Sequence, residues 1–172
     1  IETYNGIQLD AKYALQFGKD LEDLEFIPAE FQFASKEFVK QIIVAIFANK
    51  ENIIVMADKI IAEFNSSEFA EAVSMLLTRF GIFSEFDSGN ILVIKSPYAQ
   101  QFADTFNCCK NEYGFRNTNE YQTQNDTLCD EIVSIETFES QPDEKVYDLT
   151  IPKTKNFGLA NGLQVYDTSE TG

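Results

Sequence analysis

The segment Val146–Gly172, VYDLTIPKTKNFGLANGLQVYDTSETG, carries the clearest structural pattern in the chain. Residues that favour β-structure fill Val146–Ile151, and a proline followed by a polar run ends this strand. A second apolar run passes the dipeptide Asn161-Gly162, which is typical of tight turns, and ends at Gln164–Asp167. The segment therefore predicts antiparallel strands that are joined by short turns.

The order of residues in this segment resembles the C-terminal splicing region of inteins. That region reads VYDL, a short turn, NF, ANG and an apolar strand that ends in His-Asn, followed by a Cys, Ser or Thr of the host protein. The match covers Val146 to Thr168, with Gly158 as an extra residue. The resemblance implies the all-β Hint fold of inteins, whereas an ordinary hairpin would explain the alternation but not the order of residues.

The resemblance assigns roles to the residues at the junction. Asp167 stands where inteins have the terminal Asn, Tyr166 stands at the preceding His, and Thr168 is the first host residue. The Asp167 carboxylate can attack its own backbone carbonyl through a five-membered ring and give a cyclic anhydride. Tyr166 would donate a hydrogen bond, and Thr168 would supply the hydroxyl nucleophile of the ligation step. The alternative is that Asp167 has lost the reaction.

Two further residues match positions near the splice junction of the family. Asp148 corresponds to an acidic residue that tunes proton transfer, and Lys155 stands where many inteins have another His. The charge of Lys155 can stabilise an oxyanion, although the residue also suits a solvated turn. The chain contains no histidine, so the Thr-x-x-His element of the first splice site is missing. We therefore expect an N-terminal intein segment as a partner, and we expect the sequence to be a piece of a longer translation product.

The five residues after Asp167, Thr168–Gly172, resemble the start of the bridge-helix region of large RNA polymerase subunits. This resemblance suggests a multisubunit DNA-directed RNA polymerase as the host. It implies an intracellular location, in the cytoplasm or nucleus, that follows the host. The alternative is that these five residues are a polar tail.

Upstream of residue 110, apolar periodicity and capping residues predict alternating helices and hairpins. Ser35 and Asn65 (the latter with Glu68 as a capping box) are expected to cap two of the helices, and Ser96-Pro97 to begin a third. The expected elements are helix 9–17, a helix from 35 to 48, strands 53–56 and 60–64, helix 65–80, strands 82–86 and 91–95, and a helix from 96 to about 107.

This α-ββ-α-ββ-α order resembles one half of a LAGLIDADG homing endonuclease, with Ile43–Glu51 at the place of the motif. In active members a late acidic residue of the motif binds the metal that activates water. Lys50 occupies that position here, Ala48 occupies the earlier acidic position, and Glu51 is displaced by one residue. Because a hard cation needs oxygen ligands, the resemblance implies a degenerate nuclease that would use Mg²⁺ only if it were active.

The composition limits the kinds of partner that the chain is expected to bind. The net charge is −15, with 13 basic and 28 acidic residues, so weak or no binding to DNA is expected. The three cysteines, Cys108, Cys109 and Cys129, lack the spacing of a zinc site, and we expect reduced, partly buried thiols. No apolar run reaches the roughly 18 residues that span a membrane, so no membrane partner is expected.

The sequence thus predicts an α+β chain in which residues 1–110 form a LAGLIDADG-like half, residues 111–130 a connector, residues 131–167 splicing strands that begin with strand 132–138, and residues 168–172 host sequence. Self-directed cleavage and ligation, which needs no cofactor, is the leading function. The alternatives are a metal-dependent DNA endonuclease and a non-enzymatic acidic interaction domain.

Overall fold

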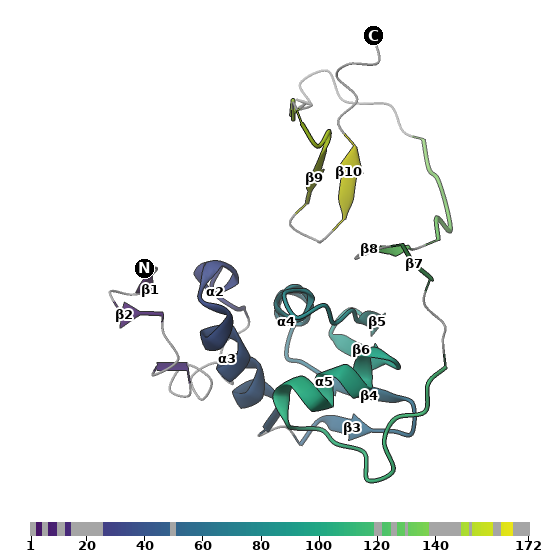
Figure 1. Ribbon diagram of the computed structural model, residues 1–172. Helices are drawn as coiled ribbons and strands as arrows, with labels where there is room; N and C mark the ends of the chain where they lie inside the picture. Colours follow the sequence, from purple (N-terminus) through teal and green to yellow (C-terminus); the bar gives the residue numbers. More distant parts are fainter. Residues whose placement is uncertain are drawn as a thin grey trace. The chain divides into compact units, whose positions relative to one another are not determined.

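The computed structural model describes residues 3–4, 7–9, 13–14, 26–48, 51–118, 122–124, 127–129, 131–137, 149–151, 153–159 and 163–166. The chain divides into two compact units, Ile1–Leu128 and Cys129–Gly172 (Figure 1). The boundary lies inside the range for which a connector is expected. Mixed α+β structure with an antiparallel sheet is confirmed, and each unit is described by itself below.

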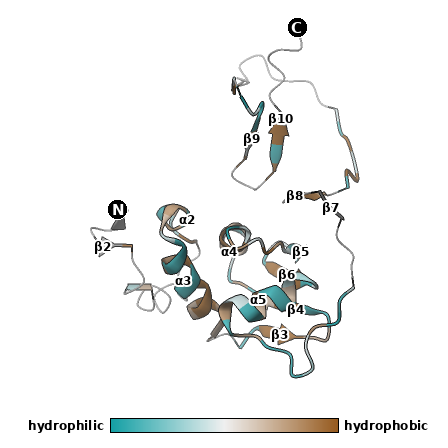
Figure 2. Ribbon diagram, viewed as in Figure 1, coloured by the Kyte–Doolittle hydropathy of each residue, from teal (hydrophilic) through white to brown (hydrophobic). Residues whose placement is uncertain are grey.

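Helix α3 (Lys36–Ala48) begins where the sequence predicts. The Ser35 hydroxyl accepts a hydrogen bond from the backbone N–H of Phe38 at 3.2 Å, which satisfies one of the free donors of the first turn. The apolar face of the helix is buried, and its polar residues alternate with it in Figure 2. Its buried residues are Phe38, Val39, Ile42, Ile43, Ala45, Ile46 and Phe47.

A four-stranded antiparallel sheet has the order β3-β4-β6-β5. Strands β3 (Ile53–Val55) and β4 (Lys59–Glu63) form the first expected hairpin, and β5 (Glu85–Ser88) and β6 (Ile91–Lys95) form the second. Because β4 pairs with β6, the two hairpins join into one sheet. The element order from α3 onward is therefore α-ββ-α-ββ-α.

Strand β5 begins three residues later than the sequence predicts. Ile82 is fully buried in the core, and the hydroxyls of Ser84 and Ser74 are hydrogen-bonded at 2.9 Å. Residues 82–84 therefore pack toward helix α4 instead of pairing with β6. Pairing starts at Glu85, opposite Val93, and the register shifts between Phe86 and Ser88.

Helix α4 (Ser67–Thr78) is capped by Ser66 and not, as expected, by Asn65. The Ser66 hydroxyl accepts a hydrogen bond from the backbone N–H of Phe69 at 3.0 Å, and its extended backbone allows this geometry. Asn65 and Ser66 are neighbouring polar residues, and either type can cap a helix. The positions of the buried residues of α4 favour Ser66. Gly81, with φ of +69°, ends the segment in the left-handed conformation as predicted.

We expect Ser66→Ala to lower the free energy of unfolding of the N-terminal unit by about 1 kcal/mol, because it leaves the N–H of Phe69 without its acceptor. Urea denaturation followed by circular dichroism measures the change. The matched variant Ser66→Asp keeps an acceptor and should retain most of the stability. Equal unfolding midpoints for Ser66→Ala and the unsubstituted chain would contradict the cap.

Helix α5 (Tyr98–Phe106) starts one residue later than predicted, with Pro97 as its N-cap. Ser96 does not cap it, because this residue is buried and its N–H donates to the carbonyl of Asp58 at 2.9 Å. Its carbonyl accepts a hydrogen bond from the Thr118 hydroxyl. Ser96 therefore ties the end of β6 to the β3–β4 turn and to the chain that follows the helix.

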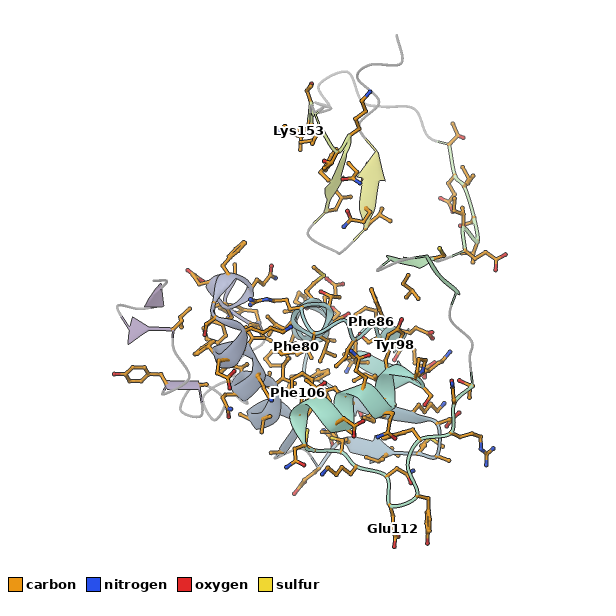
Figure 3. All side chains as sticks on the ribbon, viewed as in Figure 1. Phe80, Phe86, Tyr98, Phe106, Glu112 and Lys153 are labelled. Carbon is orange, nitrogen blue, oxygen red and sulfur yellow. The ribbon has the colours of Figure 1, made fainter. Side chains whose placement is uncertain are left out.

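The core of the N-terminal unit lies between the helices and one face of the sheet. Phe102 is fully buried, with its ring centroid 4.6 Å from that of Phe47 in α3 and 4.8 Å from that of Phe106. Figure 3 shows Phe80 beside Phe106, and their ring centroids are 5.0 Å apart. Aromatic rings from α3, from α5 and from the turn after α4 thus fix the position of α5 on the sheet.

The segment after α5 is not a free connector at its beginning. The N–H of Phe115 donates to the Gln100 side chain at 3.1 Å, and the N–H of Arg116 donates to the carbonyl of Ala57 at 2.6 Å. A short hairpin follows, formed by β7 (Gln122–Gln124) and β8 (Thr127–Cys129). Residues 111–118 therefore extend the N-terminal unit.

Smaller elements flank the core. They are β1 (Thr3–Tyr4), β2 (Ile7–Gln8) and α2 (Glu30–Phe33). Of the predicted helix 9–17, Tyr13 and Ala14 are helical, Leu9 is not, and the remainder lies outside the described residues. Among the described residues, no helix has the length and apolar character that crossing a membrane requires.

Candidate functional site

The C-terminal unit is organised around one antiparallel hairpin, β9 (Asn156–Gly158) and β10 (Gln164–Tyr166). In its register Tyr166 lies opposite Asn156, and Gln164 lies opposite Gly158. The N–H of Leu159 donates to the carbonyl of Leu163 at 2.8 Å and closes the ladder at the loop end. The predicted terminal strand pair is confirmed, while Asn161-Gly162 of its turn lies outside the described residues.

A tight turn feeds the first strand of this hairpin. The N–H of Lys155 donates to the carbonyl of Ile151 at 3.2 Å, and Lys155 has a φ of +52°. The hydroxyl of Thr154 donates to the carbonyl of Asn156 at 3.3 Å. A left-handed residue reverses the chain direction at this point, so the turn sets the place at which β9 begins.

The structure brings two of the five predicted site residues to the same end of the hairpin. Tyr166 is the cross-strand partner of Asn156, which directly follows Lys155 in the chain. Asp148, Asp167 and Thr168 lie outside the described residues. Figure 3 labels Lys153, an exposed residue of the turn that leads into this end.

The predicted strand 132–138 is wrong for the residues that the structure describes. Residues 131–137 form no strand, and their side chains are exposed. Ile132, Val133 and Ile135 are 78%, 91% and 83% exposed. This segment has no neighbouring strand to pair with in the described part of the unit, and a strand needs such a partner for its backbone groups. Leu149–Ile151 likewise lie outside any strand, and Val146–Asp148 are not described.

The C-terminal unit has no core of its own among its described side chains, since none of them is buried. Leu149, Leu159 and Leu163 are 53%, 41% and 59% exposed. An isolated two-stranded hairpin is marginally stable in water unless further strands or a helix cover it.

The sheet of the N-terminal unit has a second face that is turned away from its core. The register places Ile54, Ile61 and Val93 in one cross-strand row on this face, and none of them belongs to the core cluster. Lys59 lies directly opposite Lys95 on the same face.

Acidic residues offset the two lysines of this face. The ammonium of Lys95 lies 2.8 Å from the carboxylate of Glu85, which neutralises one charge of the lysine pair. Glu63, also on the outer face of β4, is exposed. Because phosphate contacts dominate affinity for DNA, this charge distribution gives the face little attraction for a nucleic-acid backbone.

The expected metal-binding motif spans the end of helix α3 and the residues after it. Helix α3 ends at Ala48, and Glu51 is an exposed turn residue; Lys50 lies outside the described residues. Among the residues that the structure describes, no three acidic, cysteine or histidine side chains come together as a metal site. A pocket of about 480 Å³ beside α5 offers one carboxylate, that of Asp104, among mostly amide and hydroxyl groups.

Cys108 and Cys109 form a chemically notable pair to which the sequence alone assigned no role. The two thiols are half-buried at the end of α5, as predicted, whereas Cys129 is exposed and not partly buried. The adjacency of Cys108 and Cys109 in the sequence was the available signal for a joint role.

No family model, curated protein or solved structure matches this chain.

Proposed function

We propose that this chain is the C-terminal portion of an intein that splices itself out of a host protein, with a DNA-directed RNA polymerase large subunit as the host. The supporting observation is the hairpin β9–β10. Its register brings Tyr166 next to Asn156 and the Lys155 turn, and Asp167 follows Tyr166 directly in the chain. Lys155 and Tyr166, which both match splicing residues of inteins, thereby lie at the same end of the hairpin.

The proposed chemistry is cleavage of the peptide bond between Asp167 and Thr168. A carboxylate oxygen of Asp167 attacks the carbonyl carbon of the same residue, and a five-membered cyclic anhydride forms. The C–N bond breaks, and the nitrogen of Thr168 leaves as an amine after it gains a proton. Water then opens the anhydride and restores two carboxyl groups. Tyr166 donates a hydrogen bond, although phenols in general, with an ordinary pKa of about 10, are poorer acids than the imidazolium of His at neutral pH.

Lys155 and Asp148 have supporting roles in this proposal. The ammonium of Lys155 stabilises negative charge that develops on the attacked carbonyl oxygen. Asp148 accepts and returns protons near the junction. The ligation step uses the hydroxyl of Thr168, which needs a base to activate it.

The exposed apolar residues of the C-terminal unit support a role that requires a partner. Ile132, Val133 and Ile135 lie in a segment that is rich in β-branched residues and has no strand partner among the described residues. An N-terminal intein segment would supply strands for this segment to pair with. The partner would bury these side chains and complete the fold around the hairpin.

The LAGLIDADG-like unit is proposed as a nuclease half without activity. The observed order α3, β3–β4, α4, β5–β6, α5 supports the resemblance. The cation Lys50 at the metal position, together with the Lys95–Glu85 pair on the outer sheet face, argues against metal-dependent DNA cleavage.

The proposal is tested by adding the N-terminal intein segment encoded upstream of Ile1 to the whole chain. We expect intact-mass measurements to show release of the peptide that begins at Thr168. Hydrogen exchange of the amides in β10 should slow on the order of a hundredfold, because the partner completes the sheet. The chain without its partner is the control and should show neither change.

Two results would remove the proposal. One is unchanged exchange in β10 with no cleavage after the partner has been added. The other is metal-dependent cutting of DNA by the same complex without any cut before Thr168, which would favour the endonuclease.

A further inference from the structure

The chain leaves helix α5 through an unusual backbone path at Asn107, Cys108 and Cys109. Asn107, the C-cap, has a φ of +56°, and Cys109 has a φ of +52°. Asparagine tolerates the left-handed region well, whereas it is uncommon for a side chain such as cysteine. The fold therefore holds Cys109 in a disfavoured conformation directly after the helix.

Contacts on both sides fix the two cysteines. Cys108 and Cys109 pack against the core cluster of the N-terminal unit. Two residues later, the side-chain amide of Asn111 donates to the carbonyl of Met56 at 2.9 Å. The dithiol therefore lies in a short segment between helix α5 and an anchor on the β3–β4 hairpin. Figure 3 shows Glu112 farther along this loop, pointing away from the body of the unit.

The thiols are not equivalent. The neighbouring Cys109 side chain lowers the pKa of Cys108, and burial opposes this effect. The neighbouring Cys108 side chain, together with burial, raises the pKa of Cys109. Cys108 is therefore the better nucleophile at a given pH, because the thiolate is the form that reacts.

We propose that Cys108 and Cys109 form a thiol–disulfide exchange site that closes reversibly into a disulfide between adjacent residues. The co-reactant is a small-molecule disulfide of the glutathione class. The Cys108 thiolate attacks one sulfur of this disulfide, forms a mixed disulfide and releases one thiolate. Cys109 then loses its proton and attacks the Sγ of Cys108, which releases the second thiol. Two protein thiols are oxidised, and one small-molecule disulfide is reduced to two thiols.

Geometry makes the closed form easy to reduce again. Adjacent Cα atoms across a trans peptide are about 3.8 Å apart, whereas disulfides usually join Cα atoms about 4.4–6.8 Å apart. A ring closed across one peptide bond is therefore strained, and strained disulfides belong to the labile, regulatory class. The site is thus suited to reversible oxidation and not to permanent cross-linking.

The test uses the whole chain with Cys129→Ser, which removes the exposed third thiol. After treatment with oxidised glutathione, mass spectrometry should show the loss of two hydrogens, with both cysteines in one cross-linked peptide and full reversal by dithiothreitol. Adding Cys109→Ser to this background should trap one glutathionyl group on Cys108. The matched variant Cys108→Ser should likewise form one glutathionyl adduct, on Cys109, and no internal disulfide.

Several results would overturn the site. They are a stable glutathionyl adduct on the chain that retains both cysteines, a disulfide-linked dimer as the main product, and no oxidation at all. Circular dichroism of each variant shows whether α5 is still folded, so that a failure of exchange is distinguished from a failure to fold. None of these readouts depends on splicing.

Discussion

Asp167→Ala is expected to abolish cleavage before Thr168 once the chain is joined to its N-terminal segment. The substitution removes the carboxylate that attacks the carbonyl of residue 167, and water from solution must then take its place. Well-oriented intramolecular nucleophiles have effective molarities of about 10⁵–10⁸ M, so the cleavage rate should fall by about a thousandfold or more. The measurement is the time course of the released peptide, followed by mass spectrometry.

Two matched variants separate nucleophilic attack from a general disturbance of the hairpin. Asp167→Asn keeps the five-membered ring and attacks through nitrogen, so it should give a succinimide and retain cleavage. Asp167→Glu keeps the charge but enlarges the ring, and cleavage should slow. Unchanged cleavage by Asp167→Ala would exclude Asp167 from the mechanism and remove the central step of the proposed function.

Capping residues and apolar periodicity predicted the N-terminal unit well, because its helices and strands are short and show these features clearly. Ser35 and the apolar periodicity after it fix the start and the buried face of α3 without reference to distant residues. The turn between β3 and β4 likewise joins strands that are neighbours in sequence. Such elements depend on contacts within about ten residues, so a single sequence contains most of the information.

The errors arise where a partner distant in sequence decides the conformation. Ser96 looks like a helix cap by itself, but the carbonyl of Asp58 holds its N–H elsewhere. Ile82 has a β-type pattern, but burial in the core takes it out of the sheet. Residues 131–137 would form a strand only beside another strand, and the described part of the unit shows no strand paired with them.

The candidate site likewise contains residues whose placement could be predicted from the sequence and a residue whose placement could not. The pairing of β9 with β10 could be predicted, because the loop between them is short and the apolar alternation is clear. The placement of Tyr166 near Lys155 follows from that register. Asp148 lies outside the described residues, so its placement relative to this pair stays a prediction.

Phe102→Ala should have the largest effect on the stability of the N-terminal unit. The side chain is fully buried, and its ring contacts Phe47 of α3 and Phe106 of α5. Removing a buried phenyl ring loses its transfer free energy and leaves a cavity, which costs about 3–5 kcal/mol. Because domains are stable by about 5–15 kcal/mol, the variant should unfold at a much lower urea concentration or remain partly unfolded without urea.

Phe102→Leu and Phe86→Ala make the Phe102→Ala prediction decisive even if that variant does not fold. Phe102→Leu fills most of the space and should cost about 1–2 kcal/mol. Phe86, on the edge strand β5, is 44% exposed, so Phe86→Ala should cost less than about 1 kcal/mol. If Phe86→Ala destabilised the unit more than Phe102→Leu, the helices could not share the core described above. The α-ββ-α-ββ-α packing, on which the nuclease-like resemblance depends, would then be wrong.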